Sequence, residues 1–383
     1  MAVVTVSFNG SPYGGWKEVE ITNQFDQAVG EATVQMSMTP YSENFPCQLG
    51  DVATITIDGR PVVTGHVHTV SGSDDFGSHN VRINIRDKTQ DLVDSTIGPK
   101  QEVKPPASLK RVCEDTLKKM KLKIGVVDKV SPQNFNPAEM IKGWIDDRGH
   151  NYLDRYARAR QCLLTTDGKG NLVIDRNQKR RGAQALFRGR EDNPANNIEK
   201  SSFEVSDAGR HNEHSAAGQK SPNDRKHWES KSKGEASAQS NPVSKNLGRG
   251  VDTSVRPERK QHYRGGIGVE GKTPEDAAKW RASVARGRGV DYTATVSGFY
   301  CNGQLWWPGY IIPVSDSHWN LSTEMLIKSV TLRKSFDGGE TTEVKLTEKN
   351  AFSNEPEAKK ETGRTGKGGI GNTPPGTYPD GGV

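Results

Sequence analysis

The sequence predicts a β-rich α+β protein made of several small domains. Two separate parts of the chain alternate apolar and polar residues with period two, and a segment between them has helical spacing. The hydrophobic fraction of the 383 residues is only 32%, which is low for one well-buried globule. We therefore expect two β-barrel domains, a small α/β module and a flexible tail, with part of the surface completed only by assembly.

Residues 1–98 are predicted to form the first β-barrel. The segments 32–38 and 80–86 alternate strictly between apolar and polar side chains, which indicates strands with one buried face. Asp58-Gly59 is a strong hairpin signal between the strands expected at 53–57 and 62–67. Gly98-Pro99 then marks a domain boundary.

Residues 99–185 are predicted to form an α/β module. Apolar residues recur at helical spacing over 109–120, with lysines on the opposite face, and a second helix is expected at 151–160. The segments 162–166 and 171–175 then form a hairpin around Asp167-Gly168.

Residues 186–352 are predicted to form the second β-barrel, with a polar, flexible insertion around 220–250. Thr273-Pro274 begins a helix, because Thr is a good N-cap and Pro fits the first helical position. Strands follow at 292–296, 310–314, 325–332 and 342–346, and weaker strands are expected at 201–206 and 213–218. Residues 353–383 are rich in Gly, Pro and charge, which predicts a flexible tail.

Composition limits the function classes. The net charge of +6 is mild for this length, so attraction to nucleic acid is allowed but not required. The four cysteines are widely spaced, with no CxxC pair, and we expect reduced, mostly buried thiols in a cytoplasmically assembled protein. We expect no signal peptide and no membrane-spanning segment, so the protein would leave a cell by lysis or inside a particle.

Three stretches carry a familial signal. Residues 45–97 combine Gly-Asp, a strand, IDG, a strand with TGHV, and a strand ending in RDKTQDLVDSTI. Residues 250–263 read GVDTSVRPERKQHY, and residues 291–352 form a run of strands that ends in Asn-Ala-Phe. In this order the three stretches resemble the baseplate hub proteins of Mu-like contractile bacteriophage tails, within the T-even hub and late control D-like family.

The resemblance implies an architecture and a function. In that family each subunit carries two tail-tube-like barrels, and a homotrimer forms a ring of six that matches the six-fold tail tube and the three-fold central spike. It implies a structural protein of the virion tail baseplate, assembled in the bacterial host cytoplasm, with a channel through which phage DNA passes without specific binding. The implied partners are further copies of the chain, the central spike protein, the tail tube or tube-initiator protein, and other baseplate proteins.

Three alternative functions stay open. A hub of a tailocin or another contractile injection machine would have the same subunit architecture. A tail-associated cell-wall hydrolase would need a catalytic acid pair, and a nucleic-acid-binding protein would need strong salt-dependent affinity for a duplex. We expect a protein with no catalytic residues, no cofactor and no metal.

Several small constellations were weighed as sites. His66 and His68 are two apart on a predicted strand and so share a face, but the sequence places no third metal ligand near them. His211 and His214 lack the Glu of an HExxH site. Two acid pairs fit a glycosidase only weakly: Asp146-Asp147, which is followed by His150, and Asp74-Asp75. The preferred interpretation is that these acids cap helices or lie on the solvated surface.

Other segments have a structural and a functional interpretation. The basic run Arg176–Arg190 is either a docking strip, for phosphates or for an acidic partner such as the spike, or a solvated connector. The resemblance implies that Trp306-Trp307 lies at a strand entry of the second barrel, so it is interpreted as core and inter-subunit packing rather than an exposed aromatic platform. The Gly-rich segments 265–271 and 366–371 are interpreted as loops, because neither follows a clear strand and opens a helix.

Overall fold

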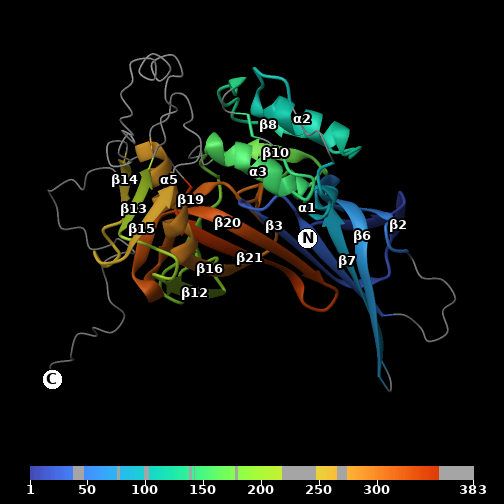
Figure 1. Cartoon of the computed structure of the whole chain (residues 1–383). Coiled ribbons are helices and arrows are strands. Elements are labelled where there is room, and N and C mark those ends of the chain that lie inside the picture. Colours follow the sequence, from blue (N-terminus) through green and yellow to red (C-terminus); the bar gives the residue numbers. More distant parts are fainter. Residues whose placement is uncertain are drawn as a thin grey trace, which may run out of the picture.

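The computed structural model describes residues 1–37, 47–75, 78–98, 103–137, 140–141, 143–176, 180–217, 247–264 and 274–352. One large β-sheet dominates these residues, with a helix-containing module on one side and a small sheet with a helix beside it (Figure 1). Strands far outnumber helices among the described elements, which confirms the predicted β-rich α+β class.

The first β unit contains six main strands. These are β1 (Val4–Phe8), β3 (Trp16–Gln24), β4 (Glu31–Ser37), β5 (Val52–Ile57), β6 (Arg60–Asp75) and β7 (Ser78–Asp87). Their order in the sheet is β3-β4-β7-β6-β5-β1, and the short β2 (Ser11–Tyr13) pairs with the outer side of β1. The predicted turn at Asp58 and Gly59 joins β5 to β6, and both residues have positive φ (49° and 77°), as a tight hairpin turn requires.

The second β unit repeats this arrangement. Its strands are β11 (Leu186–Arg188), β12 (Lys200–Val205), β16 (Val290–Ser297), β19 (Ile311–Asp316), β20 (Leu321–Ser335) and β21 (Gly339–Glu348). They follow the order β12-β16-β21-β20-β19-β11, so strands of the same rank along the chain occupy the same place in each unit. One pairing differs, because β1 runs antiparallel to β5 whereas β11 runs parallel to β19.

The two units are joined edge to edge. β20 pairs with β3 from Ser329↔Gln24 to Ser335↔Glu18, which produces a single 13-stranded sheet. The buried side chains of both units also form one continuous apolar cluster, which includes Ile21, Ile83, Val330 and Leu346. The sequence predicted two separate barrels; instead the units share a sheet and a core and neither is closed, because β20 satisfies the edge hydrogen bonds of β3.

The α/β module packs against this sheet with its own core. Its elements are α1 (Gln90–Asp94), α2 (Leu109–Lys119), β8 (Val126–Asp128), α3 (Gly149–Ala159), β9 (Leu163–Thr166) and β10 (Leu172–Asp175). The predicted helices and the β9–β10 hairpin are confirmed. Leu92 and Ile97, assigned by sequence to the first barrel, belong to the module's core instead.

A small third unit was not foreseen. β13 (Glu213–Ala217) lies between β14 (Leu247–Val251) and β15 (Lys260–Arg264), and α5 (Pro274–Gly289) packs on β13 and β14. The predicted flexible insertion around 220–250 therefore extends too far at its C-terminal boundary, because residues 247–250 belong to β14. The rest of that insertion, both Gly-rich segments and the predicted tail 353–383 lie outside the described residues.

Three short elements complete the chain that the structure describes. β17 (Tyr300–Cys301) and β18 (Gln304–Leu305) form a small hairpin, and η3 (Ser317–Trp319) links β19 to β20. Within the described ranges no helix has the length and apolar character needed to span a membrane. Three of the four free cysteines are buried and Cys301 is half-buried, as the sequence predicted.

Candidate assembly surface

The large sheet presents a polar face opposite its core. Strand alternation places the core residues on one side and a second set on the other, and this set runs without interruption from the second unit into the first. Its central members are all polar: Thr293, Thr295, Glu343, Lys345, Thr331, Arg333, Glu18, Glu20, Thr22, Thr33, Gln35, Arg82 and Asn84. A polar face of this width fits a wall for water or for a polar partner, not an apolar protein core.

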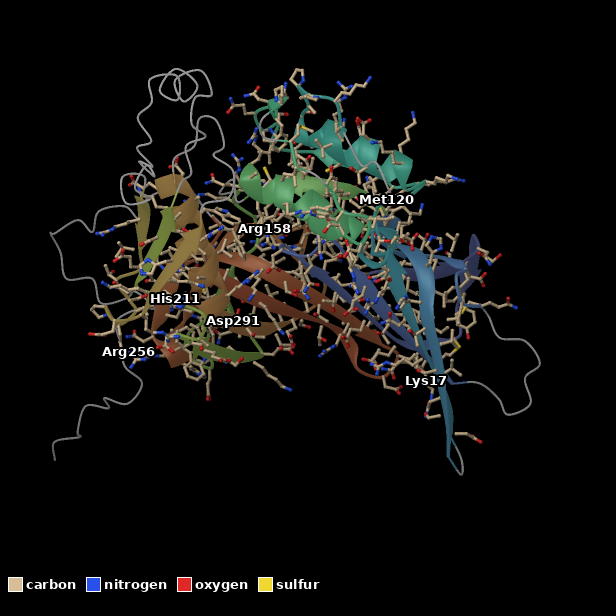
Figure 2. The ribbon with its side chains drawn as sticks, viewed as in Figure 1. Lys17, Met120, Arg158, His211, Arg256 and Asp291 are labelled. Atoms are coloured by element: carbon tan, nitrogen blue, oxygen red, sulfur yellow. The ribbon has the colours of Figure 1, made fainter. Side chains whose placement is uncertain are left out.

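Both charge signs alternate along this face. Arg333 Nε donates to Glu20 Oε2 at 2.9 Å, and the Thr22 and Thr331 hydroxyls lie 3.1 Å apart, so polar pairs cross the β3–β20 junction itself. In the second unit, Lys328 Nζ donates to Asp291 Oδ1 at 3.1 Å (Figure 2 labels Asp291). Because the charges compensate one another, this face would exert little net attraction on a polyanion.

The second unit contains a buried polar cluster around Asp316. This carboxylate is fully buried and accepts hydrogen bonds from Arg188 at 2.7 and 3.0 Å, from Tyr292 at 2.6 Å and from Ser201 at 2.8 Å. Burial alone would raise the pKa of Asp316, but the hydrogen bond from Arg188 and those from Tyr292 and Ser201 outweigh it and hold the pKa below its ordinary value. The cluster ties β11, β12, β16 and β19 together.

Four arginines of the basic run Arg176–Arg190 bind groups of the chain itself, and docking of a partner by this run stays a prediction. Arg176 donates to backbone carbonyls at the end of α3, and Arg180 pairs with the buried Asp175 at 2.5 Å. Arg181 pairs with Glu324 of β20, and Arg188 belongs to the Asp316 cluster. Of these four, only Arg181 reaches from the segment after the module to the second unit, and its side chain is 72% exposed. Residues 177–179 are outside the described part of the chain.

The histidine pairs lack the surroundings of a metal site. His66 and His68 line a shallow pocket of about 420 Å³, and His66 Nδ1 lies 3.1 Å from the carbonyl of Gly50. The His211 and His214 rings meet edge to face at 5.5 Å (Figure 2 labels His211), and His214 Nδ1 lies 2.8 Å from Tyr263 Oη. Across the described ranges, no three His, Cys, Asp or Glu side chains gather closely enough to hold a metal ion.

Burial, then the neighbouring His211, lowers the pKa of His214 to about 4. The imidazole is therefore neutral at physiological pH, which suits a group enclosed in the core of the small third unit.

The acidic candidates have different local settings. Asp147 Oδ2 accepts the backbone N–H of Trp144 at 2.9 Å and an ion pair from Arg155, so it shapes the turn before α3. Asp74 lies near the far end of β6, in the long β6–β7 hairpin that extends away from the module (Figure 1). The two acid pairs thus lie in different parts of the fold, one in the module and one at the end of the large sheet.

The tryptophan pair packs in and against the core, as predicted, and also bridges the two units. Trp306 is buried in the shared core, and Trp307 packs against it with the Arg60 guanidinium 5.8 Å from its ring. Nearby, Tyr300 Oη donates to Asp58 Oδ2 at 2.8 Å. The β17–β18 hairpin of the second unit therefore contacts the β5–β6 turn of the first.

Sequence reasoning missed two further buried acids. Asp252 accepts hydrogen bonds from Arg210 at 2.8 Å and from Arg286 at 3.0 Å. Burial alone would raise the pKa of Asp252, but the hydrogen bonds from Ser254 and these two arginines outweigh burial and hold the pKa at about 2. The stretch 250–263 contains this acid, so the resemblance marked its neighbourhood without revealing its role. Asp87, buried between the first unit and the module, accepts from Thr166 Oγ1 at 2.5 Å.

Comparison with known proteins agrees with this architecture. Residues 3–87 match the family model "Mu phage baseplate assembly protein GpP-like, N-terminal". The chain is 22% identical over 374 residues to baseplate hub protein gp44 of Escherichia phage Mu, covering 96% of this chain and 94% of that protein. The predicted resemblance to Mu-like baseplate hub proteins is confirmed.

Solved structures extend the resemblance to the whole fold. The 43 kDa tail protein of prophage MuSo2 from Shewanella oneidensis is 23% identical, with a TM-score of 0.74 over 92% of this chain and 99% of that chain. The tail protein from Neisseria meningitidis MC58 is 19% identical, also with a TM-score of 0.74, over 92% and 98%. The Escherichia coli c3393 protein, described as a type VI secretion component similar to T4 tail proteins gp27 and gp5, shares the fold at a TM-score of 0.51, with 10% identity over 92% of this chain and 79% of that chain.

Proposed function

We propose that this chain is the structural hub of a contractile phage tail baseplate, joining the central spike to the tail tube. The observation that carries the proposal is the internal repeat, in which two six-stranded units of the same topology share one sheet and one polar face. Three chains then present six equivalent units, which is the number needed to meet a six-fold tube while keeping three-fold symmetry toward a spike. The similarity to baseplate hub protein gp44 of phage Mu supports the same role.

In the proposed assembly, the polar sheet face lines the channel through which the genome leaves. Its charges alternate and compensate, for example at Arg333 and Glu20, so DNA would pass without being held. The function is therefore mechanical and architectural, with no catalysis and no cofactor. The hub would act in the virion tail baseplate after assembly in the bacterial host cytoplasm.

The test is the mass of the assembled protein. Light scattering of the full-length chain, mixed with its candidate spike and tube proteins, should show a hub species of about three times 42.0 kDa. A chain that stays monomeric in that mixture contradicts the proposal. A peptidoglycan zymogram tests the hydrolase alternative, and clearing of the gel by the purified chain would overturn the non-catalytic role.

A second candidate function is the hub of a different contractile injection machine. The shared fold with the E. coli c3393 protein favours it, since that protein is described as a secretion component. Recovery of the chain from purified particles separates the two, because a phage tail carries a DNA-filled head and a tailocin or secretion spike does not.

A further inference from the structure

The internal repeat assigns each residue of one β unit an equivalent in the other. Both long strands carry a β-bulge, after Val67 in β6 and after Ile327 in β20, and pairing resumes at Thr69 and Ser329. Following the registers outward from these points makes Val70 equivalent to Val330 and Gly72 equivalent to Leu332. The edge strand β3 of the first unit corresponds in the same way to the edge strand β12 of the second.

One of the two equivalent junctions is already made inside the chain. The second half of β20, from Ser329 to Ser335, pairs with β3, and the core-facing residues on both sides are buried there. Val330, Leu332 and Ile21 are each at most 2% exposed. The register of this internal junction therefore predicts how the equivalent strands, β6 and β12, would pair if they met.

The strands equivalent to β20 and β3 are β6 and β12, and in the described chain no strand covers their corresponding edges. β5 pairs with β6 only up to His66, and among the strands that the structure describes the second half of β6 pairs with β7 alone. Correspondingly, Gly72 and Asp74 are exposed and Val70 is only half-buried. β12 pairs with β16 alone among the described strands, and its Val205 is 45% exposed although the equivalent residue on β3, Asn23, is 3% exposed.

Backbone alternation shows which groups on β12 point outward. Ser206 N–H donates to Gly289 O, so the even residues of β12 bond to β16. Ser201, Phe203 and Val205 therefore direct their N–H and C=O groups to the open edge.

The same reasoning applies to β6. Lys88 N–H donates to Thr64 O, which fixes the phase of the β6–β7 ladder before the bulge. Carried past the bulge, that phase leaves Val70 and Gly72 facing the open side. The two edges thus present complementary rows of donors and acceptors.

We infer that β12 of one subunit pairs antiparallel with the second half of β6 of the next copy of this chain, in the register of the β3–β20 junction. This inference rests on the proposed function, because it requires that copies of the chain form a ring. The register places Val205 across from Val70, Phe203 across from Gly72 and Ser201 across from Asp74. Each subunit donates one edge and accepts one, so the contact is head to tail and closes a ring.

The side chains at this register fit one another. Phe203 is half-buried and would lie across from a glycine, so its ring has space where Leu332 occupies the equivalent place in the internal junction. Val205 and Val70, two incompletely covered apolar residues, would cover each other.

A cysteine pair on the polar face tests the register. Ser71 and Glu204 are both exposed, and the register makes them a non-hydrogen-bonded pair with Cα atoms about 4.5 Å apart, within disulfide range. The variant Ser71→Cys with Glu204→Cys, mixed with the candidate spike and tube proteins under mild copper-catalysed air oxidation, should give covalent multimers on a non-reducing denaturing gel. The matched control is Ser73→Cys with Glu204→Cys, two residues out of register.

We expect at least about tenfold more covalent multimer from the in-register pair than from the control, because a diagonal Cα separation near 8 Å is too long for a disulfide. Each single-cysteine variant should stay monomeric on the gel. If light scattering shows a trimer while the two pairs cross-link equally or not at all, the edge register is wrong although the hub function stands. If no oligomer forms in the mixture, the hub function itself fails.

Discussion

The two β units share a topology but differ in what their cores are made of. At equivalent core positions the first unit has Ala32 and Val19, whereas the second has Tyr292 and Ser201, both bonded to Asp316. The same strand order thus tolerates either an apolar core or one with an enclosed ion pair. The alternation of polar and apolar residues sets the topology, and the chemistry inside each unit is adjustable.

The largest expected loss of stability follows from breaking the Asp316 cluster, which only the second unit contains. Asp316→Ala leaves the Arg188 guanidinium, 13% exposed in its side chain, without its carboxylate and removes the partner of Tyr292. We expect a loss of roughly 3–5 kcal/mol in the free energy of unfolding, since an uncompensated charge remains buried. Chemical denaturation followed by tryptophan fluorescence measures it.

A small loss for Asp316→Ala would mean that water solvates Arg188 in the variant and that the second unit is as adaptable as the first. Replacing both partners, with Arg188→Met and Asp316→Leu, is the matched control. It should recover most of the stability, because removal of both charges relieves the desolvation cost.

The next difference concerns covered and open edges of equivalent strands. Ile21→Ala on β3 empties a site that is 1% exposed and should cost roughly 2–5 kcal/mol. Val205→Ala on β12, at a residue 45% exposed, should cost less than about 0.5 kcal/mol in the monomer. Thermal unfolding of both variants, at a concentration where light scattering shows monomers, gives the comparison; equal losses would show that β12 is already covered.

Much of this fold is visible in the sequence, and the reason is local. The strict alternation at 32–38 and 80–86 predicted β4 and β7, and Asp58-Gly59 predicted the β5–β6 turn. The β3–β20 junction could not be predicted, because it joins residues some 300 positions apart by backbone hydrogen bonds that leave no mark on side-chain choice. The same holds for β13, which pairs with segments that a long polar stretch separates from it.

The polar clusters were beyond sequence reasoning for a different reason. A single Asp such as Asp316 or Asp252 looks like a turn or surface residue until the fold brings arginines from other elements to it. The basic run Arg176–Arg190 shows the same limit, because three of its arginines find acids on the folded chain that sequence spacing does not reveal.

Two buried carboxylates, one in each unit, should respond oppositely to pH. Asp316 has Arg188 beside it, whereas burial and then the neighbouring Asp167 raise the pKa of Asp87 to about 7 despite the Thr166 hydrogen bond. The folded pKa of Asp87 is above its unfolded value, so the folded state binds more protons between pH 4 and 7. Its contribution to stability is present below about pH 4 and is lost as pH rises through 7.

The variant Asp87→Asn isolates this effect. Between pH 4 and 8 its free energy of unfolding should fall less than that of the wild type by roughly 1–4 kcal/mol, since each pH unit contributes at most about 1.4 kcal/mol. Urea titrations at a series of pH values measure it, with Asp316→Asn as the comparison. Parallel pH profiles for wild type and Asp87→Asn would show that the wild-type carboxylate is stabilised in its charged form.

The smallest effect is expected where the two units meet on the polar face. Glu20 accepts from Arg333 at 2.9 Å, but the side chains are 33% and 44% exposed, so solvent screens the pair. Glu20→Gln should therefore cost at most about 1 kcal/mol in low salt, and the difference should disappear near 1 M salt, where the screening length is about 3 Å. A double-mutant cycle with Arg333→Gln separates the pair from its surroundings. A coupling well above 1 kcal/mol that survives high salt would mean that the ion pair, and not the shared sheet and core beneath it, holds the two units in register.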